Sequence, residues 1–268
     1  MLKTRLITAG IAVALLTIVL ITDKIWLTIG VVLVAIVGVC ELYAAAGLIK
    51  NKFLCTLGLI GSVLVCLGDM LDPHYVMSLV FIYFLLIFIA MLYNHKEITL
   101  ENVALILFGN VYVAYFLTHI VLIRRLEGSG QYLVWLVFLG ACAADTFAYF
   151  VGRAFGKHKM APEISPHKTT EGAVGGIIGT GFSFLLFGAI LAKYFNLHLD
   201  MTRLFILGIL CAVVGEIGDL AASAIKRHYN IKDFGYIFPG HGGVLDRFDS
   251  ILLVAPAVYL FINNVGLM

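Results

Sequence analysis

Residues 203–222 read RLFILGILCAVVGEIGDLAA, a run that is apolar except for Arg203, Glu216 and Asp219. A helix of about 20 mostly apolar residues is long enough to cross the hydrocarbon core of a bilayer. Eight further apolar runs lie before and after this one, so the sequence predicts nine membrane-spanning helices. They fall at 6–22, 25–47, 53–71, 75–93, 99–122, 132–152, 173–192, 203–222 and 250–267.

The composition of the whole chain agrees with this prediction. Of the 268 residues, 62% are hydrophobic and 13% are charged, and the mean hydropathy is +1.03. Soluble domains contain about 45–50% apolar and about 25% charged residues. We therefore expect an all-α integral membrane protein. The net charge of +2 gives no indication of a nucleic-acid partner, and the five cysteines lack metal-ligand spacing, so neither a zinc site nor a disulfide is predicted.

The distribution of basic residues predicts the orientation in the membrane. With the N-terminus in the cytoplasm, thirteen Lys and Arg residues lie on the cytoplasmic side and five on the other. The C-terminus is then expected on the opposite side. Two long polar connections, 153–172 and 224–249, both face the cytoplasm. We expect about five N-terminal spans in residues 1–122, and a catalytic region with about four spans and these two loops in residues 123–268.

Acidic side chains inside the spans are the first candidates for chemistry, because each costs at least about 2.5–3.5 kcal/mol to insert. Four acids lie well inside predicted spans: Glu41, Asp145, Glu216 and Asp219. Asp145 lies among small residues shortly before the first long loop, so we interpret it as functional. Glu41 stands alone near the end of its helix, and we interpret it as a packing or snorkelling group that matters little for activity.

Glu216 and Asp219 are three residues apart and therefore share one helix face, which Ser223 and Lys226 continue. Two carboxylates at this spacing repel each other unless a cation or a proton joins them. One interpretation is a metal site below the headgroup layer. The other is a structural salt bridge to Lys226 or Arg227.

The second long loop combines glycines with acids and bases. Its segment 239–243, Pro-Gly-His-Gly-Gly, can adopt positive φ and present backbone N–H groups to an anion. Asp246 and Asp249, again three apart, open the last predicted helix. Hard oxygen ligands beside basic residues are typical of a Mg²⁺–phosphate site, so His241 is interpreted as a phosphate or turn residue, not as a metal ligand.

The first long loop ends in the segment 164–172, Ile-Ser-Pro-His-Lys-Thr-Thr-Glu-Gly. Lys168 could bind a phosphate or pyrophosphate from this loop. The hydroxyls of Thr169 and Thr170, with the carboxylate of Glu171, could either contribute to that binding or cap the following helix.

Together these residues resemble the phosphatidate cytidylyltransferases, also called CDP-diacylglycerol synthases, over the whole chain. The matching pattern is Ser223-x₂-Lys226-Arg227-x₄-Lys232-Asp233-x-Gly235-x₃-Pro239-Gly240-His241-Gly242-Gly243-x₂-Asp246-Arg247-x-Asp249. Two departures are visible upstream. The family usually has Lys-Lys-Thr-Trp where this chain has residues 167–170, His-Lys-Thr-Thr, and glycine where it has Phe147.

The resemblance implies a Mg²⁺-dependent reaction of CTP with phosphatidate that gives CDP-diacylglycerol and pyrophosphate. A second bound cation could also take part. It also implies a homodimer in the inner membrane of a bacterium, surrounded by membrane lipid, with its active site facing the cytoplasm. The catalytic residues are then Asp219, Asp246, Asp249 and Lys226, and the metal ligands are Asp219, Asp246 and Asp249 with Asp145 and Glu216. Substrate-binding residues are Ser165, Lys168, Thr169, Glu171, Ser223, Arg227, Lys232, Gly240, His241, Gly242, Gly243 and Arg247.

Three rival classes explain part of the pattern. A prenol or dolichol-type lipid kinase has similar C-terminal membrane segments but releases a nucleoside diphosphate. A CDP-alcohol phosphotransferase would need a D-G-x-x-A-R run, which this sequence lacks. An ion- or proton-coupled transporter would explain buried acids but not the long basic, glycine-rich loop.

Overall fold

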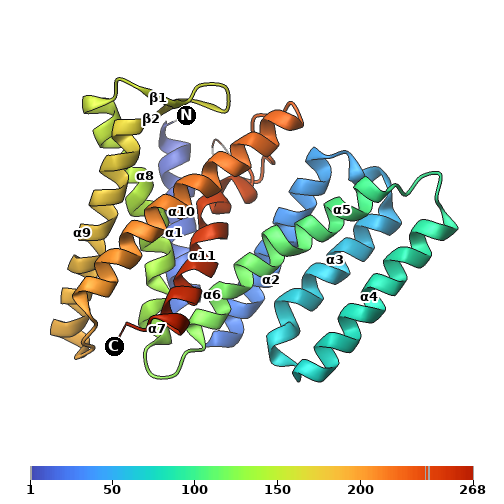
Figure 1. Ribbon diagram of the computed structural model, residues 1–268, viewed down its shortest axis with the longest axis horizontal. Coiled ribbons are helices and arrows are strands. Elements are labelled where there is room, and N and C mark those ends of the chain that lie inside the picture. Colours follow the sequence, from blue (N-terminus) through green and yellow to red (C-terminus); the bar gives the residue numbers. More distant parts are fainter. Residues whose placement is uncertain (1, 239, 241, 268) are drawn as a thin grey trace. The chain divides into compact units, whose positions relative to one another are not determined.

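The computed structural model describes residues 2–238, 240 and 242–267 and is mainly helical (Figure 1). Its elements are α1 (Leu2–Ile21), α2 (Lys24–Ala45), η1 (Leu48–Lys50), α3 (Lys52–Leu67), η2 (Gly68–Met70), α4 (Pro73–Tyr93), α5 (Leu100–Gly109), η3 (Asn110–Tyr115), α6 (Phe116–Arg124), α7 (Gly130–Leu133), α8 (Trp135–Phe155), β1 (Lys159–Ala161), β2 (Ser165–Thr169), α9 (Thr170–Phe195), α10 (Met201–His228) and α11 (Leu245–Asn264). The chain forms two compact units. One comprises Met1–Thr118 and Ile231–Arg247, and the other comprises His119–Asn230 and Phe248–Met268.

Seven helices in the described part of the chain are long and apolar enough to cross a membrane. They span Lys24–Ala45, Lys52–Met70, Pro73–Tyr93, Leu100–Arg124, Gly130–Phe155, Thr170–Phe195 and Met201–His228. The expectation of a helical membrane protein agrees with this result. Each of the nine predicted apolar runs coincides with a helix, but α1 and α11 are not among the seven. The count of nine spans and the sides of the two termini therefore stay predictions.

The helices begin where short polar side chains can accept the first backbone N–H groups. Asp200 accepts from Thr202 and Arg203 at the start of α10. Asp72 does the same for His74 at the start of α4, where Pro73 occupies the first helical position. These caps explain why long apolar helices start at defined residues and not at the edge of each hydrophobic run.

The first unit is built mainly on apolar contacts of α2, α3 and η3, a π-helical segment. A hydrogen-bonded group of three polar side chains lies inside it, Ser62, Asn110 and Tyr83. Ser62 Oγ donates to Asn110 Oδ1 at 2.8 Å, and Asn110 Nδ2 donates to Tyr83 Oη at 2.7 Å. The amide thus has a partner at each end, as a buried polar group requires.

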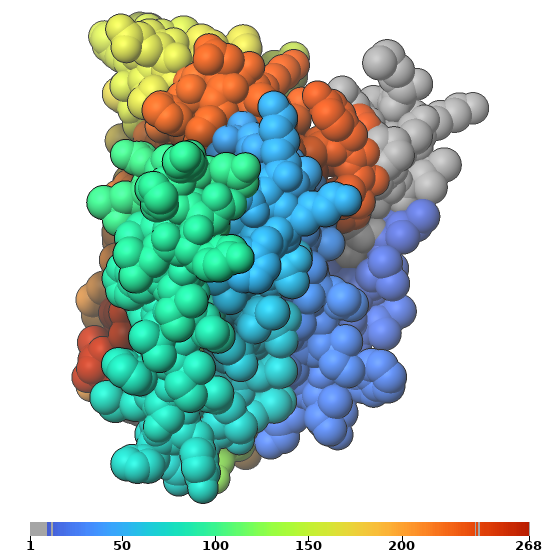
Figure 2. Space-filling model, turned by 90° about the vertical axis from the view of Figure 1, so that its right-hand side faces the viewer, coloured from blue at the N-terminus to red at the C-terminus, as the bar shows by residue number. Residues whose placement is uncertain are grey.

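On the outside of this unit α4 exposes large apolar side chains, among them Phe81 and Met77, and its surface can be followed in Figure 2.

The second unit packs α9 against both α8 and α10 (Figure 1). Glycines allow this close approach, because they have no side chain to separate the helices. A Cβ added at Gly176 would lie 3.0 Å from the carbonyl oxygen of Ala144 on α8. At Gly208 on α10 it would lie 2.9 Å from Cα of Gly181 on α9.

The two long connections are shorter and more ordered than expected. In place of a loop at 153–172, α8 continues to Phe155, and β1 and β2 then form an antiparallel hairpin in which Lys159 pairs with Thr169 and Ala161 with Ser165. The expected all-α class holds for most of the described chain, but this short hairpin was not anticipated. The backbone N–H and C=O groups of the polar segment are satisfied by pairing with each other. In place of a loop at 224–249, α10 continues to His228 and α11 begins at Leu245.

Candidate active site

An ion-pair cluster on α10 is the centre of the candidate site in the second unit. Lys168 Nζ, from β2, lies 2.7 Å from Glu216 Oε1 and 2.6 Å from Asp219 Oδ2. The one-face arrangement of the two acids is therefore confirmed, and a cation does join them. This cation is the ammonium of Lys168, which the salt-bridge alternative did not name.

The electrostatics of this cluster keep Lys168 charged. Burial of the ammonium lowers its pKa, but the negative charges and hydrogen bonds of Asp219 and Glu216 raise the pKa by more, and the net result lies above the usual value for lysine. The arrangement shows that the acid pair on α10 can hold a positive group.

Asp249, the fifth residue of α11, belongs to the same cluster. Burial, and then the negative charge of Asp219, raise the pKa of the Asp249 carboxyl to about 7. The positive charge of Lys226 lowers this pKa, and the negative charge of Asp145 raises it by a smaller amount. Three other predicted site residues, Asp219, Lys226 and Asp145, therefore act electrostatically on Asp249 within the second unit.

Gly218 explains how α10 and α11 come so close at this point. A Cβ added at Gly218 would lie 2.8 Å from the carbonyl oxygen of Asp249 and 3.3 Å from Cα of Ser250. Next to it, Ser223 Oγ donates to Asp219 Oδ1 at 3.4 Å. The sequence Gly218-Asp219 thus pairs a small residue for close packing with the acid that faces the neighbouring carboxylates.

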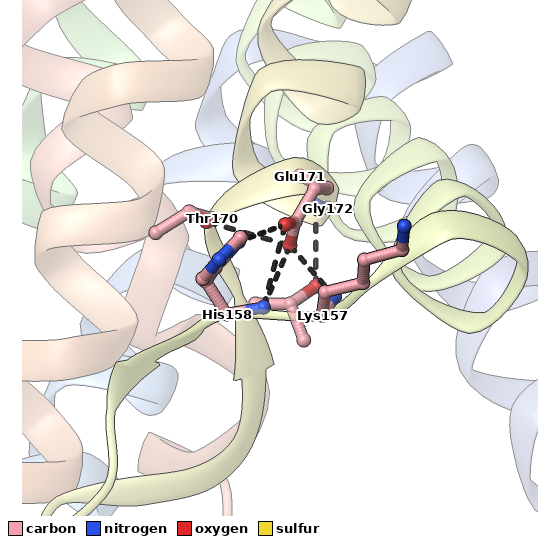
Figure 3. Close-up of polar contacts among 6 residues, drawn as sticks. Lys157, His158, Thr170, Glu171 and Gly172 are labelled. Atoms are coloured by element: carbon pink, nitrogen blue, oxygen red, sulfur yellow. Dashed lines mark hydrogen bonds and ion pairs between the residues drawn. The ribbon is translucent and has the colours of Figure 1, made fainter.

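The hairpin that carries Lys168 is fixed to α9 by Glu171 (Figure 3). The Glu171 carboxylate accepts the backbone N–H groups of Lys157, at 3.1 Å, and His158, and it lies 2.6 Å from His158 Nδ1. Thr169 Oγ1 accepts the N–H of Gly172 at 3.2 Å and caps α9. Of the two roles left open for these side chains, the structure supports the structural one for Thr169 and gives Glu171 an anchoring role.

The glycine-rich segment belongs to the first unit and is organised by Asp246. Asp246 is only 6% exposed, and its Oδ2 accepts the N–H of Phe234 at 2.7 Å and of Gly243 at 3.0 Å. Gly240 and Gly242 adopt φ values of +80° and +83°, which L side chains rarely adopt. The expected positive-φ backbone is present, and the Gly243 N–H donates to the Asp246 carboxylate. His241 lies outside the described residues.

Glu41 is the residue that sequence reasoning interpreted wrongly. Its carboxylate accepts the N–H of Val244 at 2.9 Å and of Leu245 at 2.7 Å, at the beginning of α11. It is therefore not an isolated packing or snorkelling group. The sequence carried no local signal for this contact because its partners lie 203 and 204 residues further along the chain.

The remaining predicted binding residues are placed as follows. Arg227 Nε donates to the carbonyl oxygen of Ile164 at 3.5 Å, and Ser165 begins β2. Lys232 and Arg247 are exposed residues of the first unit.

Within residues 2–238, 240 and 242–267, no group of three or more His, Cys, Asp or Glu side chains is arranged to hold a metal ion. Carboxylate oxygens are the donors that a hard cation prefers, and those of Glu216 and Asp219 hold the ammonium of Lys168.

Comparison with known proteins points to one family. The model of the cytidylyltransferase family matches residues 3–265. Proteins named phosphatidate cytidylyltransferase are similar to this chain: that of Bacillus subtilis is 38% identical over 164 residues, covering 61% of this chain and 60% of the relative. That of Staphylococcus saprophyticus is 39% identical, covering 52% of each chain. That of Rickettsia bellii is 34% identical, covering 75% of this chain and 89% of the relative. The matched part thus spans less than two thirds of the first two relatives.

Proposed function

Because the chain belongs to the cytidylyltransferase family, we propose that it transfers a cytidylyl group from CTP to phosphatidate. A phosphate oxygen of phosphatidate attacks the α-phosphorus of CTP. The bond between that phosphorus and the oxygen bridging to the β-phosphorus breaks, and pyrophosphate leaves. The products are CDP-diacylglycerol and pyrophosphate. The names of the relatives support this choice of substrates.

The ion-pair cluster of Lys168 with Glu216 and Asp219 is the observation that carries the proposal. Phosphate transfer between two anionic substrates needs positive charge held at a fixed point more than it needs a strong base, since the attacking oxygen is already ionised. An acid pair that holds an ammonium, next to Asp249 and Lys226, supplies fixed charges of both signs. This chemistry suits nucleotidyl transfer.

We assign roles to the residues on this basis. Lys168, Lys226 and Arg227 bind phosphate oxygens of the triphosphate and the lipid. Lys232 and Arg247 are further substrate-binding residues of the proposal. Ser223 orients an oxygen through its hydroxyl. Asp219, Asp246 and Asp249, with Asp145 and Glu216, provide the negative charge that a cation needs.

Magnesium is part of the proposal because carboxylate oxygens are the ligands it prefers. Glu216, Asp219 and Asp249 fit such an ion in donor chemistry, since two of them already hold a positive group. When bound, Mg²⁺ would neutralise charge on the phosphates. Lys168, which pairs with these acids, would bind the anionic substrate.

We extend the proposal to location and assembly. Seven apolar helices and bacterial relatives support a place in the inner membrane, and the excess of basic residues supports a site that faces the cytoplasm. The acyl chains of the lipid would stay in the bilayer. A homodimer rests on the family resemblance alone.

One assay tests the function. Purified protein is incubated with phosphatidate, Mg²⁺ and CTP labelled at the α-phosphate, and label is measured in the lipid phase together with released pyrophosphate. We expect both in equal amounts. Release of a nucleoside diphosphate with lipid labelled only from γ-labelled nucleotide would identify a lipid kinase and overturn the proposal.

A further inference from the structure

Glu41 of α2 caps a helix that begins 204 residues later. Its two carboxylate oxygens accept different N–H groups: Oε1 accepts from Val244 and Oε2 from Leu245. Glu41 is only 7% exposed. A buried carboxylate that accepts two backbone N–H groups is held in one orientation, and it holds the donors in return.

The start of α11 needs an acceptor from elsewhere. The first N–H groups of a helix have no partner within the helix, and a Ser, Thr, Asp or Asn before the first turn normally accepts one. Val244 occupies that position here and has no side-chain acceptor. Glu41 therefore provides what the local sequence does not.

Two glycines of the loop are explained by the same carboxylate. A Cβ added at Gly235 would collide with Glu41 Oε1, and one added at Gly243 would collide with both of its carboxylate oxygens. Glycine at these positions leaves room for the carboxylate. For Gly243 this reason differs from the anion contact that the sequence suggested.

Glu41 and Asp246 together order the segment that leads into α11. The consecutive N–H groups of residues 243, 244 and 245 donate to these two carboxylates. Asp246, whose side chain we assign to the reaction, directly follows these residues. Any movement of the backbone at Val244 and Leu245 therefore moves the Asp246 carboxylate.

We propose that Glu41 is a positioning residue for cytidylyl transfer, acting through the backbone at the start of α11 on Asp246 and contacting no substrate. This inference rests on the proposed function of the same site. It assigns a role in the reaction to the N-terminal helices, through one side chain.

Glu41→Gln is the first test, because glutamine has the same size but offers one acceptor oxygen where two are needed. We expect kcat to fall about ten- to a hundredfold, because this is the effect expected when a hydrogen bond to a charged group is lost. KM for CTP and for phosphatidate should change less than threefold. Glu101→Gln, the same change at an exposed position on α5, is the matched control and should retain wild-type kcat. A folded Glu41→Gln protein with wild-type kcat would overturn the proposal.

A double-mutant cycle with Gly243 separates positioning from a phosphate contact. Gly243→Ala should lower kcat in the wild-type background, because the new methyl group displaces the Glu41 carboxylate. In a Glu41→Ala background the methyl group has room, so Gly243→Ala should lower kcat by less than a further twofold. Equal losses in both backgrounds would mean that Gly243 acts without Glu41, and the proposal would fail.

Hydrogen exchange on the wild-type protein tests the contact without any variant. The amides of Val244 and Leu245 should exchange much more slowly than those of the exposed residues Tyr236 and Ile237. Rapid exchange at 244 and 245 would overturn the positioning role even if the Glu41 variants did not fold. If the wild-type protein is inactive in the labelled-CTP assay but these amides are protected, the proposed function fails and the structural contact stands.

Discussion

Gly218 on α10 lies so close to Asp249 on α11 that a Cβ at Gly218 would be 2.8 Å from the Asp249 carbonyl oxygen. The neighbouring residue is Asp219, whose negative charge raises the pKa of the Asp249 carboxyl. The distance between these two carboxylates therefore depends on the absence of a side chain at residue 218.

Gly218→Ala should push α10 and α11 apart at this point. Overpacking of this kind costs about 1–3 kcal/mol, and the separation of Asp219 from Asp249 should lower kcat as well as the thermal midpoint. Gly10→Ala is the control, since nothing lies within 4 Å of a Cβ at Gly10. Wild-type activity of Gly218→Ala would show that the close contact is not needed.

Asp219→Asn and Asp249→Asn should each abolish formation of CDP-lipid, because both remove a negative charge from the cation-binding acids while keeping the size of the side chain. Circular dichroism in detergent should show the wild-type helix content. Asp246→Asn should also be inactive. Near-normal turnover of a variant at saturating Mg²⁺ would remove that residue from the proposed set of metal ligands.

Lys168→Met should make the stability of the protein depend on divalent cations. Without the ammonium, Glu216 and Asp219 lose their shared positive partner and repel each other. We expect a lower thermal midpoint than wild type in EDTA and recovery on addition of Mg²⁺, whereas the wild-type midpoint should change little. Equal responses of the two proteins to Mg²⁺ would contradict this.

Glu171→Gln should release the hairpin β1–β2 from α9, since its carboxylate accepts the N–H groups of Lys157 and His158. Limited trypsin digestion should cut the variant faster than wild type after Lys157 or Lys159, with kcat reduced because Lys168 is less well held. The exposed Glu163 in the turn of the hairpin offers the control Glu163→Gln. Identical digestion of Glu171→Gln and wild type would show that the anchor is dispensable.

Helix positions could be predicted from the sequence because each depends on a local apolar run, and every predicted run coincides with a helix. The hairpin was missed because residues 159–169 are polar and irregular, with no apolar alternation that would indicate strands. The acid pair on α10 was recognised because both members lie on one face of one helix.

The partners of these acids could not be predicted in the same way. Lys168 reaches Asp219 from another element, and two nearer bases, Lys226 and Arg227, were equally good candidates by spacing. Glu41 was misinterpreted for the same physical reason: its hydrogen bonds go to backbone N–H groups, which every sequence has and which no residue type indicates.

The ion pair between Lys168 and Asp219 has a consequence for how metal affinity should be measured. At the proposed cation site, a divalent ion that binds Asp219 would have to replace the ammonium of Lys168, a counter-ion that the protein itself supplies. The measured affinity for the ion would then reflect a competition with Lys168. A substitution that makes β2 more mobile would change this affinity without altering any carboxylate that holds the ion.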